Sequence, residues 1–141
     1  MAEDANPGYG YFEHDADIGI IGCGPTLAAA LEQAAAATFA IMAEPAQVEA
    51  RIKVDFEFIE ADPDYALVTL LNRLLAEARL HRAVFSRFRV RQEGELWQVQ
   101  ATGETWRPEL ARGTEVKGAT LTMLTVRPIL GGWEARCVVD V

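Results

Sequence analysis

Three acids and a histidine stand close together near the start of the chain, in the run Glu13-His14-Asp15-Ala16-Asp17. In an extended chain, residues two positions apart lie on one face, so Glu13, Asp15 and Asp17 would share a side and His14 would point to the other. Ca²⁺ and Mg²⁺ prefer carboxylate and carbonyl oxygens as ligands, so this run is a candidate cation site. The spacing matches no strong metal motif, and the alternative of a solvated strand entrance or hairpin mouth stays open.

A second set of oxygen donors stands at the other end of the sequence. The chain closes on Val139-Asp140-Val141, so the Asp140 side chain and the terminal carboxylate of Val141 are adjacent at the end of an apolar strand-like segment. A site shared with the N-terminal acids requires the two chain ends to meet, and domain termini often lie close together. The alternative is a frayed end with two idle carboxylates.

Enzymatic sites have weaker support. A nucleophilic triad needs a base beside a nucleophile, and the sequence offers only His14 and His81, with no glycine-flanked serine. Cys23 and Cys137 are far apart and follow no metal-binding spacing, which indicates small buried thiols rather than a disulfide or a zinc site.

The charge pattern bears on nucleic-acid binding. A formal net charge of -8 opposes unassisted binding to a phosphate backbone. The only basic run consists of Arg79, Arg82, Arg87, Arg89 and Arg91. Such a run is either the solvated face of a strand or an RNA-facing patch.

Hydrophobic periodicity predicts the elements that must position these groups. Residues 9–23 are extended, and a helix capped by Thr26 runs to about Ala43. A strand with alternating burial follows from Val48, and a second amphipathic helix begins after Asp62-Pro63 and reaches about His81. Four further strands are predicted at residues 83–91, 96–103, 121–127 and 133–141, with a polar, glycine-rich loop at 112–120.

Length and composition complete the structural expectation. The 141 residues, of which 50% are hydrophobic and 24% charged, are typical of one globular domain. We expect residues 1–10 to be a flexible leader and residues 11–141 a single α+β domain, with two helices packed on a mixed, largely antiparallel sheet whose terminal strands lie close together. No signal peptide or membrane-spanning run is evident, so we expect a cytoplasmic protein.

Three separate motifs, in register, resemble the archease family. They are Phe12-Glu13-His14-Asp15-Ala16-Asp17-Ile18-Gly19-Ile20 with Gly24-Pro25-Thr26-Leu27 after it, Gly113-Thr114-Glu115-Val116-Lys117-Gly118-Ala119-Thr120, and the closing Val139-Asp140-Val141. Order and spacing correspond from about residue 11 to residue 141. The resemblance implies a small α+β protein, not itself an enzyme, that activates the RNA ligase of tRNA splicing and RNA repair. By the same resemblance, the protein would help the ligase histidine to become guanylylated by GTP, so that the ligase turns over repeatedly.

Carried onto this sequence, the resemblance implies a divalent cation, usually Ca²⁺ with Mg²⁺ as the alternative, held by Asp17, Asp140 and the last residue, Val141. It places Lys117 near the ligase active site during activation. His14 and Glu115 also match motif positions, so we count them with Lys117 as ligase-activating residues. The implied partner is a protein, the RNA ligase, and RNA is contacted only indirectly.

The sequence departs from the family pattern at two positions. Asp15 stands where the family usually has threonine, and Leu121 stands where it usually has tyrosine. Asp15 would add a negative charge beside the cation. The alternative function is a general RNA-binding or chaperone-like module that uses the basic strand at residues 79–91, and its RNA affinity would fall steeply with salt.

Overall fold

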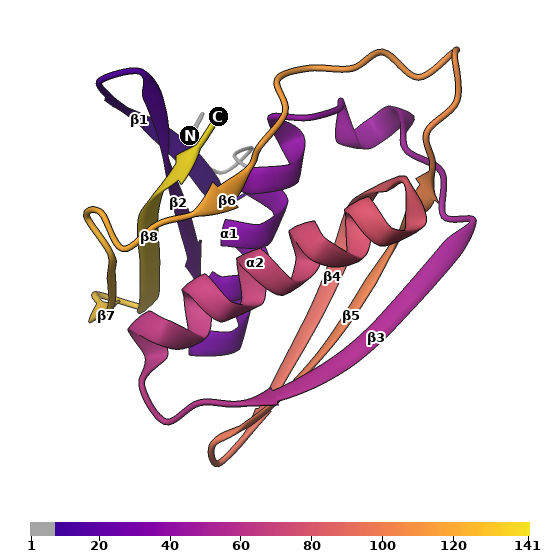
Figure 1. Cartoon of the computed structure of the whole chain (residues 1–141). Coiled ribbons are helices and arrows are strands. Elements are labelled where there is room, and N and C mark those ends of the chain that lie inside the picture. Colours follow the sequence, from indigo (N-terminus) through magenta and orange to yellow (C-terminus); the bar gives the residue numbers. More distant parts are fainter. Residues whose placement is uncertain (1–7) are drawn as a thin grey trace.

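The computed structural model describes residues 8–141, which fold into one α+β unit with two α-helices and two antiparallel sheets (Figure 1). The first seven residues of the expected leader lie outside the described part of the chain. Tyr9 and Gly10, also expected in the leader, belong instead to the first strand. The α+β expectation is confirmed, but the strands form two sheets rather than one, and every pairing among residues 8–141 is antiparallel.

The first sheet contains both terminal strands. Its order is β1 (Tyr9–His14), β2 (Asp17–Gly24), β8 (Gly132–Asp140) and β6 (Gly118–Ala119), and β7 (Thr125–Ile129) also pairs with β8. The expected closeness of the N- and C-terminal strands is therefore confirmed, since β2 and β8 are neighbours. Figure 1 shows the C-terminus beside the β1–β2 hairpin.

The second sheet has the order β3 (Ile52–Ile59), β5 (Leu96–Thr105) and β4 (Ala83–Glu93). In β3, Val54 and Phe56 are buried while the alternating residues Lys53, Asp55 and Glu57 are exposed, as the sequence predicts. The strand begins at Ile52 instead of Val48, and residues 48–51 connect it to a 3-10 turn over Pro45–Gln47. One face of this sheet is therefore packed and the other is solvated.

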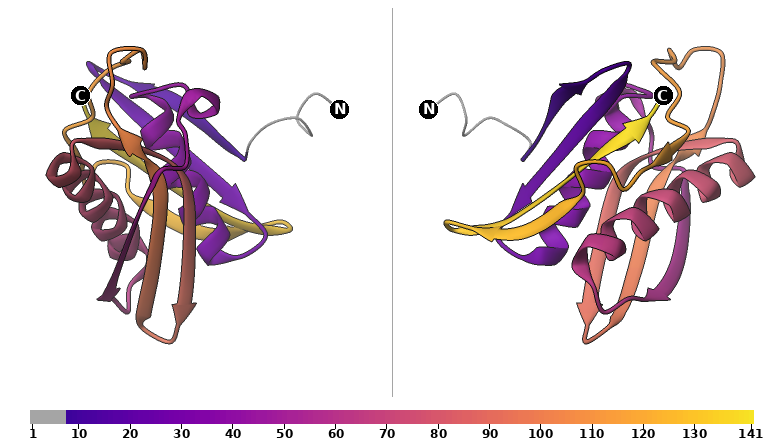
Figure 2. Two further views of the ribbon diagram at one scale, coloured as in Figure 1. Left: turned by 90° about the vertical axis from the view of Figure 1, so that its right-hand side faces the viewer. Right: turned by 60° about the vertical axis from the view of Figure 1, so that its left-hand side comes forward.

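Helix α1 (Leu27–Ala40) lies between the two sheets (Figures 1 and 2). Thr26 caps it as predicted, because the Ala29 N–H donates to Thr26 Oγ1 at 3.1 Å. The helix ends three residues before the expected Ala43. Pro45 has no N–H for the Ile41 carbonyl that another helical turn would require, and that carbonyl accepts from Thr114 N at 3.0 Å instead.

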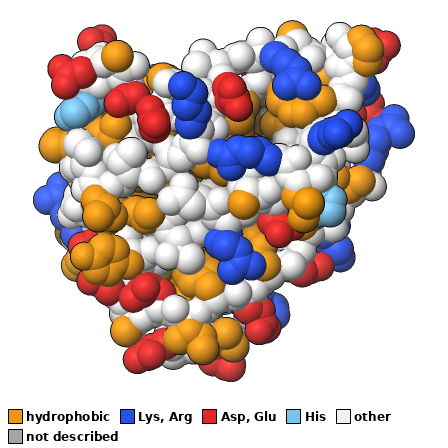
Figure 3. Space-filling model, viewed as in Figure 1, with side chains coloured by type: hydrophobic (Ala, Val, Ile, Leu, Met, Phe, Trp, Pro, Cys, Tyr) orange, Lys and Arg blue, Asp and Glu red, His pale blue; other side chains and the backbone are white. Residues whose placement is uncertain are grey.

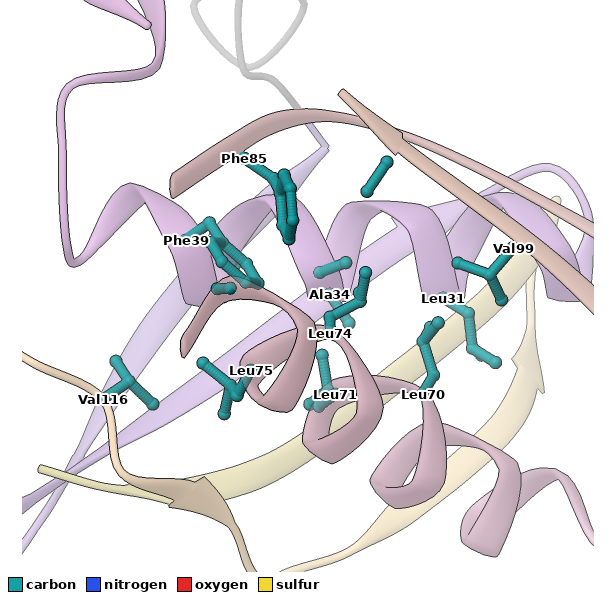
Figure 4. Close-up of a cluster of buried hydrophobic side chains, with 14 of the residues drawn as sticks. Leu31, Ala34, Phe39, Leu70, Leu71, Leu74, Leu75, Phe85, Val99 and Val116 are labelled. Atoms are coloured by element: carbon teal, nitrogen blue, oxygen red, sulfur yellow. The ribbon is translucent and has the colours of Figure 1, made fainter. Parts of the chain in front are cut away.

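Helix α2 (Pro63–His81) covers α1 and the edge of both sheets. Asp62 caps it and Pro63 occupies its first turn, as the sequence predicts, and the helix ends at His81 as expected. Figure 4 shows Leu70, Leu71 and Leu74 of α2 directed toward Leu31 and Ala34 of α1. The two helices and both sheets thus share one hydrophobic core.

The predicted strand at residues 121–127 is wrong at its start. Pairing with β8 occurs first at Gly118–Ala119, inside the expected loop, and again from Thr125. Leu121 and Met123 lie in a turn between the two pairings and are 62% and 53% exposed. Their apolar pattern suggested a strand, but neither side chain is buried by the sheet.

The two cysteines are free, as expected. Cys137 is fully buried, and burial raises the pKa of its thiol to about 12, so this group stays protonated near neutral pH. Cys23 is half-buried, and burial raises its pKa as well. Thiolate chemistry is therefore suppressed at both positions.

Glu104 is a buried carboxylate, 1% exposed, at the end of β5. It accepts a 2.7 Å hydrogen bond from Arg107 Nε and another of 2.7 Å from the Glu49 N–H. The Arg107 hydrogen bond, followed by that of Glu49, holds the pKa of the Glu104 carboxyl below its usual range. The ionised carboxylate therefore ties the segment before β3 to the segment after β5.

This pair makes a prediction about acid unfolding. A carboxyl whose pKa is lower in the folded state contributes stability above its unfolded pKa, and that stability is lost as the pH falls through the folded pKa. The substitution Glu104→Gln should therefore lower the free energy of unfolding at neutral pH. It should also reduce, by about one, the number of protons that the protein takes up when it unfolds in acid. Chemical denaturation measured between neutral and acidic pH would test this, with the exposed Glu57→Gln as control. Equal pH slopes for Glu104→Gln and the unmodified chain would contradict it.

Candidate functional site where the chain ends meet

Strand order and register bring the three sequence motifs into one row across the first sheet. His14 of β1 pairs with Asp17 of β2, at the two ends of the hairpin turn. Ile18 pairs with Val139, so Asp17 lies opposite Asp140, and Asp140 in turn pairs with Gly118 of β6. We call His14, Asp17, Asp140 and Gly118 the cross-strand row. It joins residues that are more than a hundred positions apart in the sequence.

The C-terminus is docked at this row. The Val141 N–H donates to Asp17 Oδ1 at 3.4 Å, a long hydrogen bond, and Val141 packs partly against the core. The Asp140 carbonyl accepts from the Lys117 N–H at 2.7 Å. The expected halves of the site, Asp17 on one side and Asp140 with Val141 on the other, therefore meet, and the chain end is not frayed.

The donor chemistry of this junction fits a hard divalent cation. Residues directly opposite in an antiparallel pair have Cβ atoms roughly 4.5–5.5 Å apart, which brings the Asp17 and Asp140 carboxylates together on one face. Val141, the third residue of the expected ligand set, directly follows Asp140 and contacts Asp17 through its N–H. Within residues 8–141 no group of three or more His, Cys, Asp and Glu side chains is positioned to hold a metal, so main-chain oxygens would have to complete the ligand set.

The expectation that Glu13, Asp15 and Asp17 share one strand face is wrong. Asp15 and Ala16 form the turn between β1 and β2, so the chain reverses inside the acidic run. Asp15 has a left-handed backbone with φ of 52°, which aspartate tolerates better than most residues, and its side chain is 93% exposed. The hairpin-mouth alternative describes these residues correctly, and only Asp17 enters the cross-strand row next to the C-terminus.

His14 ends the cross-strand row on the β1 side. Its Nδ1 atom is buried and has no hydrogen-bond partner among residues 8–141. The nearest acidic group recorded for it, Asp15 Oδ2, lies 3.9 Å away, which is too far for a hydrogen bond. The ring therefore retains an unused polar atom beside the junction, and a group from outside the described chain could satisfy it.

Lys117 is exposed, and its peptide is held from two sides. Its N–H donates to β8 at Asp140, and its carbonyl accepts from Arg79 Nη2 of α2. Asn72, about two turns earlier on α2, exchanges two hydrogen bonds with the Ala119 backbone, at 2.9 Å and 3.3 Å. Helix α2 thus fixes the two-residue strand β6, and with it the position from which the Lys117 side chain leaves the surface.

Asn72 and Arg79 are functional-site residues that the sequence analysis missed. Both are exposed polar residues of an amphipathic helix, and nothing in their spacing distinguishes them from an ordinary solvated face. The one available signal was an asparagine in the middle of a leucine-rich helix, a position where asparagine is unfavourable unless its amide has a partner.

Removing this amide should loosen the Lys117 segment. We expect Asn72→Ala to lower the free energy of unfolding by about 1–2 kcal/mol, because two backbone groups of Ala119 lose their partner. Hydrogen exchange at the Ala119 amide should speed up, while exchange in the second sheet stays unchanged. Leu80→Ala, at a 74% exposed position of the same helix, serves as the control. Unchanged protection at Ala119 would show that Asn72 does not hold β6.

Glu115, the remaining motif residue, is exposed and lines a cavity next to the cross-strand row rather than the row itself. It lies two positions before Lys117 in the loop that leads into β6. The structure therefore brings together five of the six expected site residues and leaves Glu115 at the edge of a separate hollow.

The basic run does not form one continuous patch. Arg89 and Arg91 project from the outer face of β4, opposite Gln100 and Gln98 of β5. These glutamines donate to carboxylates of β3, Gln100 to Asp55 at 3.1 Å and Gln98 to Glu57 at 3.0 Å. Rows of acid, amide and arginine thus cross the sheet, as expected of a solvated strand face. Arg79 and Arg82 lie elsewhere, at the end of α2.

The structure is a small α+β domain in which the two ends of the chain meet in a row of acidic residues flanked by a lysine. Comparison with known proteins assigns its family. The sequence model of the archease protein family matches residues 9–141. The chain belongs to this family.

The chain is similar to curated archeases over nearly its whole length. It is 32% identical to the protein archease of Methanosarcina mazei, with 94% of this chain and 95% of that protein covered. It is also 32% identical to the protein archease of Sulfolobus acidocaldarius, with 93% and 96% covered.

Solved structures share the fold. Protein 1598 of Methanobacterium thermoautotrophicum superposes with a TM-score of 0.81 at 26% identity, covering 95% of this chain and 99% of that one. An archease from Thermotoga maritima, described as a possible chaperone, gives a TM-score of 0.65 at 18% identity and supports the fold alone.

None of the helices within residues 8–141 has the length and apolar character needed to cross a membrane.

Proposed function

We propose that this chain is a non-enzymatic accessory protein that activates an RNA ligase of tRNA splicing and RNA repair. The observation that carries the proposal is the cross-strand row, which gathers all three archease motifs beside an exposed, rigidly held lysine. Membership of the archease family supports an accessory role, and a protein partner suits a surface of net charge -8 better than RNA does.

Guanylylation of a ligase histidine forms a bond between a ring nitrogen and the α-phosphorus of GTP and releases pyrophosphate. A reaction of this kind is accelerated mainly by positioning and by stabilising the negative charge of the phosphates. The Lys117 ammonium can meet phosphate oxygens as a point charge, and the contacts from Asp140 and Arg79 restrict where its backbone presents it.

A divalent cation bound by Asp17, Asp140 and the Val141 carboxylate would offset two of the three negative charges gathered there and fix the C-terminus. The residues that would hold the cation also have structural roles of their own. Asp17 anchors the terminal peptide through its own hydrogen bond, and Asp140 connects that end to Lys117 through its main chain. At the other end of the row, the buried Nδ1 of His14 has no hydrogen-bond partner among residues 8–141.

The test is a combined guanylylation and ligation assay with purified RNA ligase, an RNA substrate, α-labelled GTP and a divalent cation. With the chain present in less than stoichiometric amounts, ligated RNA should exceed the amount of ligase, and a chelator should reverse this gain. No increase over ligase alone would refute the proposal. Salt-sensitive binding of the isolated chain to RNA would favour the RNA-binding alternative instead.

A further inference from the structure

A cavity of about 530 Å³ lies next to the cross-strand row, between the C-terminal end of α2, the start of β4 and the loop before β6. This volume falls within the range of about 300–1,000 Å³ that is usual for ligand sites. Its inner wall is apolar and includes the buried side chains of Leu75, Ala78 and Val116. The exposed loop residues 113–115, which belong to the third motif, form its outer wall.

Arginines stand around this cavity, although the chain as a whole is acidic. Arg79, Arg82 and Arg112 line it and are exposed, and Glu115 is the one carboxylate among its lining residues. Within residues 8–141 no salt bridge is recorded for any of the three arginines. Figure 3 shows several basic side chains around hydrophobic surface in the upper right of that face. The rim thus presents unneutralised positive charge beside an apolar wall.

The chemistry of the wall indicates what kind of anion fits. The guanidinium of Arg112 lies 4.1 Å from the centre of the Trp106 ring, so one face of the only aromatic side chain lining the cavity is already covered. The remaining wall is aliphatic, with Met42 and Leu75 among its members. Aliphatic side chains bury well against such a wall, whereas a nucleotide base would have to displace the Arg112 guanidinium to stack on that face of Trp106.

A polynucleotide fits this site poorly for a second reason. A phosphate backbone requires a continuous basic track, and the next arginines, on β4, face amides and acids of the second sheet. A short protein segment needs only local complementarity. Arginine and tryptophan are enriched in the parts of protein interfaces that contribute most to binding. An aliphatic side chain flanked by carboxylates would pack against the apolar wall of the cavity and pair with the arginines at its rim.

We propose that this cavity is the docking site for an acidic segment of the partner protein, which inserts an aliphatic side chain against Leu75 and Val116 and places carboxylates on Arg82 and Arg112. The identity of that partner, the RNA ligase, rests on the proposed function. Docking here would bring the partner alongside Lys117, since the outer wall of the cavity and Lys117 belong to one loop.

The first test uses the isolated chain and a defined probe. A short fluorescein-labelled peptide in which leucines alternate with aspartates should bind, and amide NMR should map it to residues 113–116. Two control peptides, with asparagine for every aspartate or serine for every leucine, should bind at least about tenfold more weakly. Equal affinity for either control, or tighter binding of a uridine oligonucleotide at the same amides, would overturn the proposal.

Charge-reversal variants locate the site. Arg82→Glu and Arg112→Glu should each weaken peptide binding by about tenfold or more, because each replaces an attraction by a repulsion. Arg89→Glu makes the same change on the outer face of β4 and should leave binding unaltered. Loss of binding in all three variants would indicate non-specific attraction and would also contradict a site in this cavity.

A second readout separates this proposal from the proposed function. If the unmodified chain stimulates the ligase, Arg82→Glu and Arg112→Glu should require higher concentrations for half-maximal stimulation. Unchanged concentration dependence would exclude the cavity as the ligase docking site while leaving the activation function intact. If the unmodified chain fails to stimulate, the proposed function fails, and the peptide titration still decides whether the cavity binds acidic segments.

Discussion

Gly22→Val is expected to lower the free energy of unfolding by about 3 kcal/mol, close to the upper end of the usual cost of overpacking. Gly22 lies in β2 where α1 approaches most closely. A Cβ atom added there would stand 2.3 Å from Ala34 N and 2.5 Å from Ala30 O, and both of these are backbone atoms of the helix. Side-chain rotation cannot relieve such a clash, so the helix must move away from the sheet that carries the cross-strand row.

Thermal unfolding would measure this effect, which corresponds to a decrease in melting temperature of roughly 10 °C for a domain of this size. Gly10→Val is a matched control on the neighbouring strand β1, because an added Cβ there meets nothing within 4 Å. It should change stability by no more than about 0.5 kcal/mol. Equal effects of the two substitutions would show that the close packing of α1 on β2 does not limit stability.

Asp17→Asn and Asp140→Asn are expected to reduce the affinity for Ca²⁺ by at least about tenfold each, since affinity for hard cations depends on the number of charged ligands. Asparagine keeps a carbonyl oxygen of similar position, so in Asp17→Asn the hydrogen bond from Val141 N can persist. A loss of Ca²⁺ affinity in Asp17→Asn would therefore result from the missing carboxylate charge and not from detachment of the C-terminus.

Isothermal titration calorimetry with Ca²⁺, and separately with Mg²⁺, would measure this affinity without any ligase. Asp55→Asn, on the solvated face of the second sheet, removes the same charge far from the row and should leave cation binding unchanged. If Asp17→Asn and Asp140→Asn bind the cation as the unmodified chain does, the proposed ligand set is wrong.

Local sequence signals were sufficient for much of the framework. Thr26 and the Asp62-Pro63 pair marked the two helix starts, because capping and proline chemistry act within a few residues. The alternating pattern of β3 was an equally local signal. The same signals placed the end of α1 too late, since the contact that satisfies the Ile41 carbonyl comes from Thr114, far along the chain.

The residues that come together in the candidate site depend on how the strands pair, and sequence patterns do not specify strand pairing. Asp17, Asp140 and Val141 could be named from the motifs, but their meeting required the β2–β8 register. The short strand β6 could not be recognised at all, because two residues have no periodicity. It exists through bonds from β8 and from Asn72, and this tertiary support outweighs the loop-like composition of the segment.

The most direct test of the cross-strand row as the activating site is the rate of ligase guanylylation with saturating amounts of three variants. Asp17→Asn and Lys117→Ala should each lose most of the stimulation given by the unmodified chain while unfolding at a similar temperature. Asp55→Asn, outside the row, should stimulate fully. Full stimulation by folded Lys117→Ala and Asp17→Asn would contradict the central role of the row.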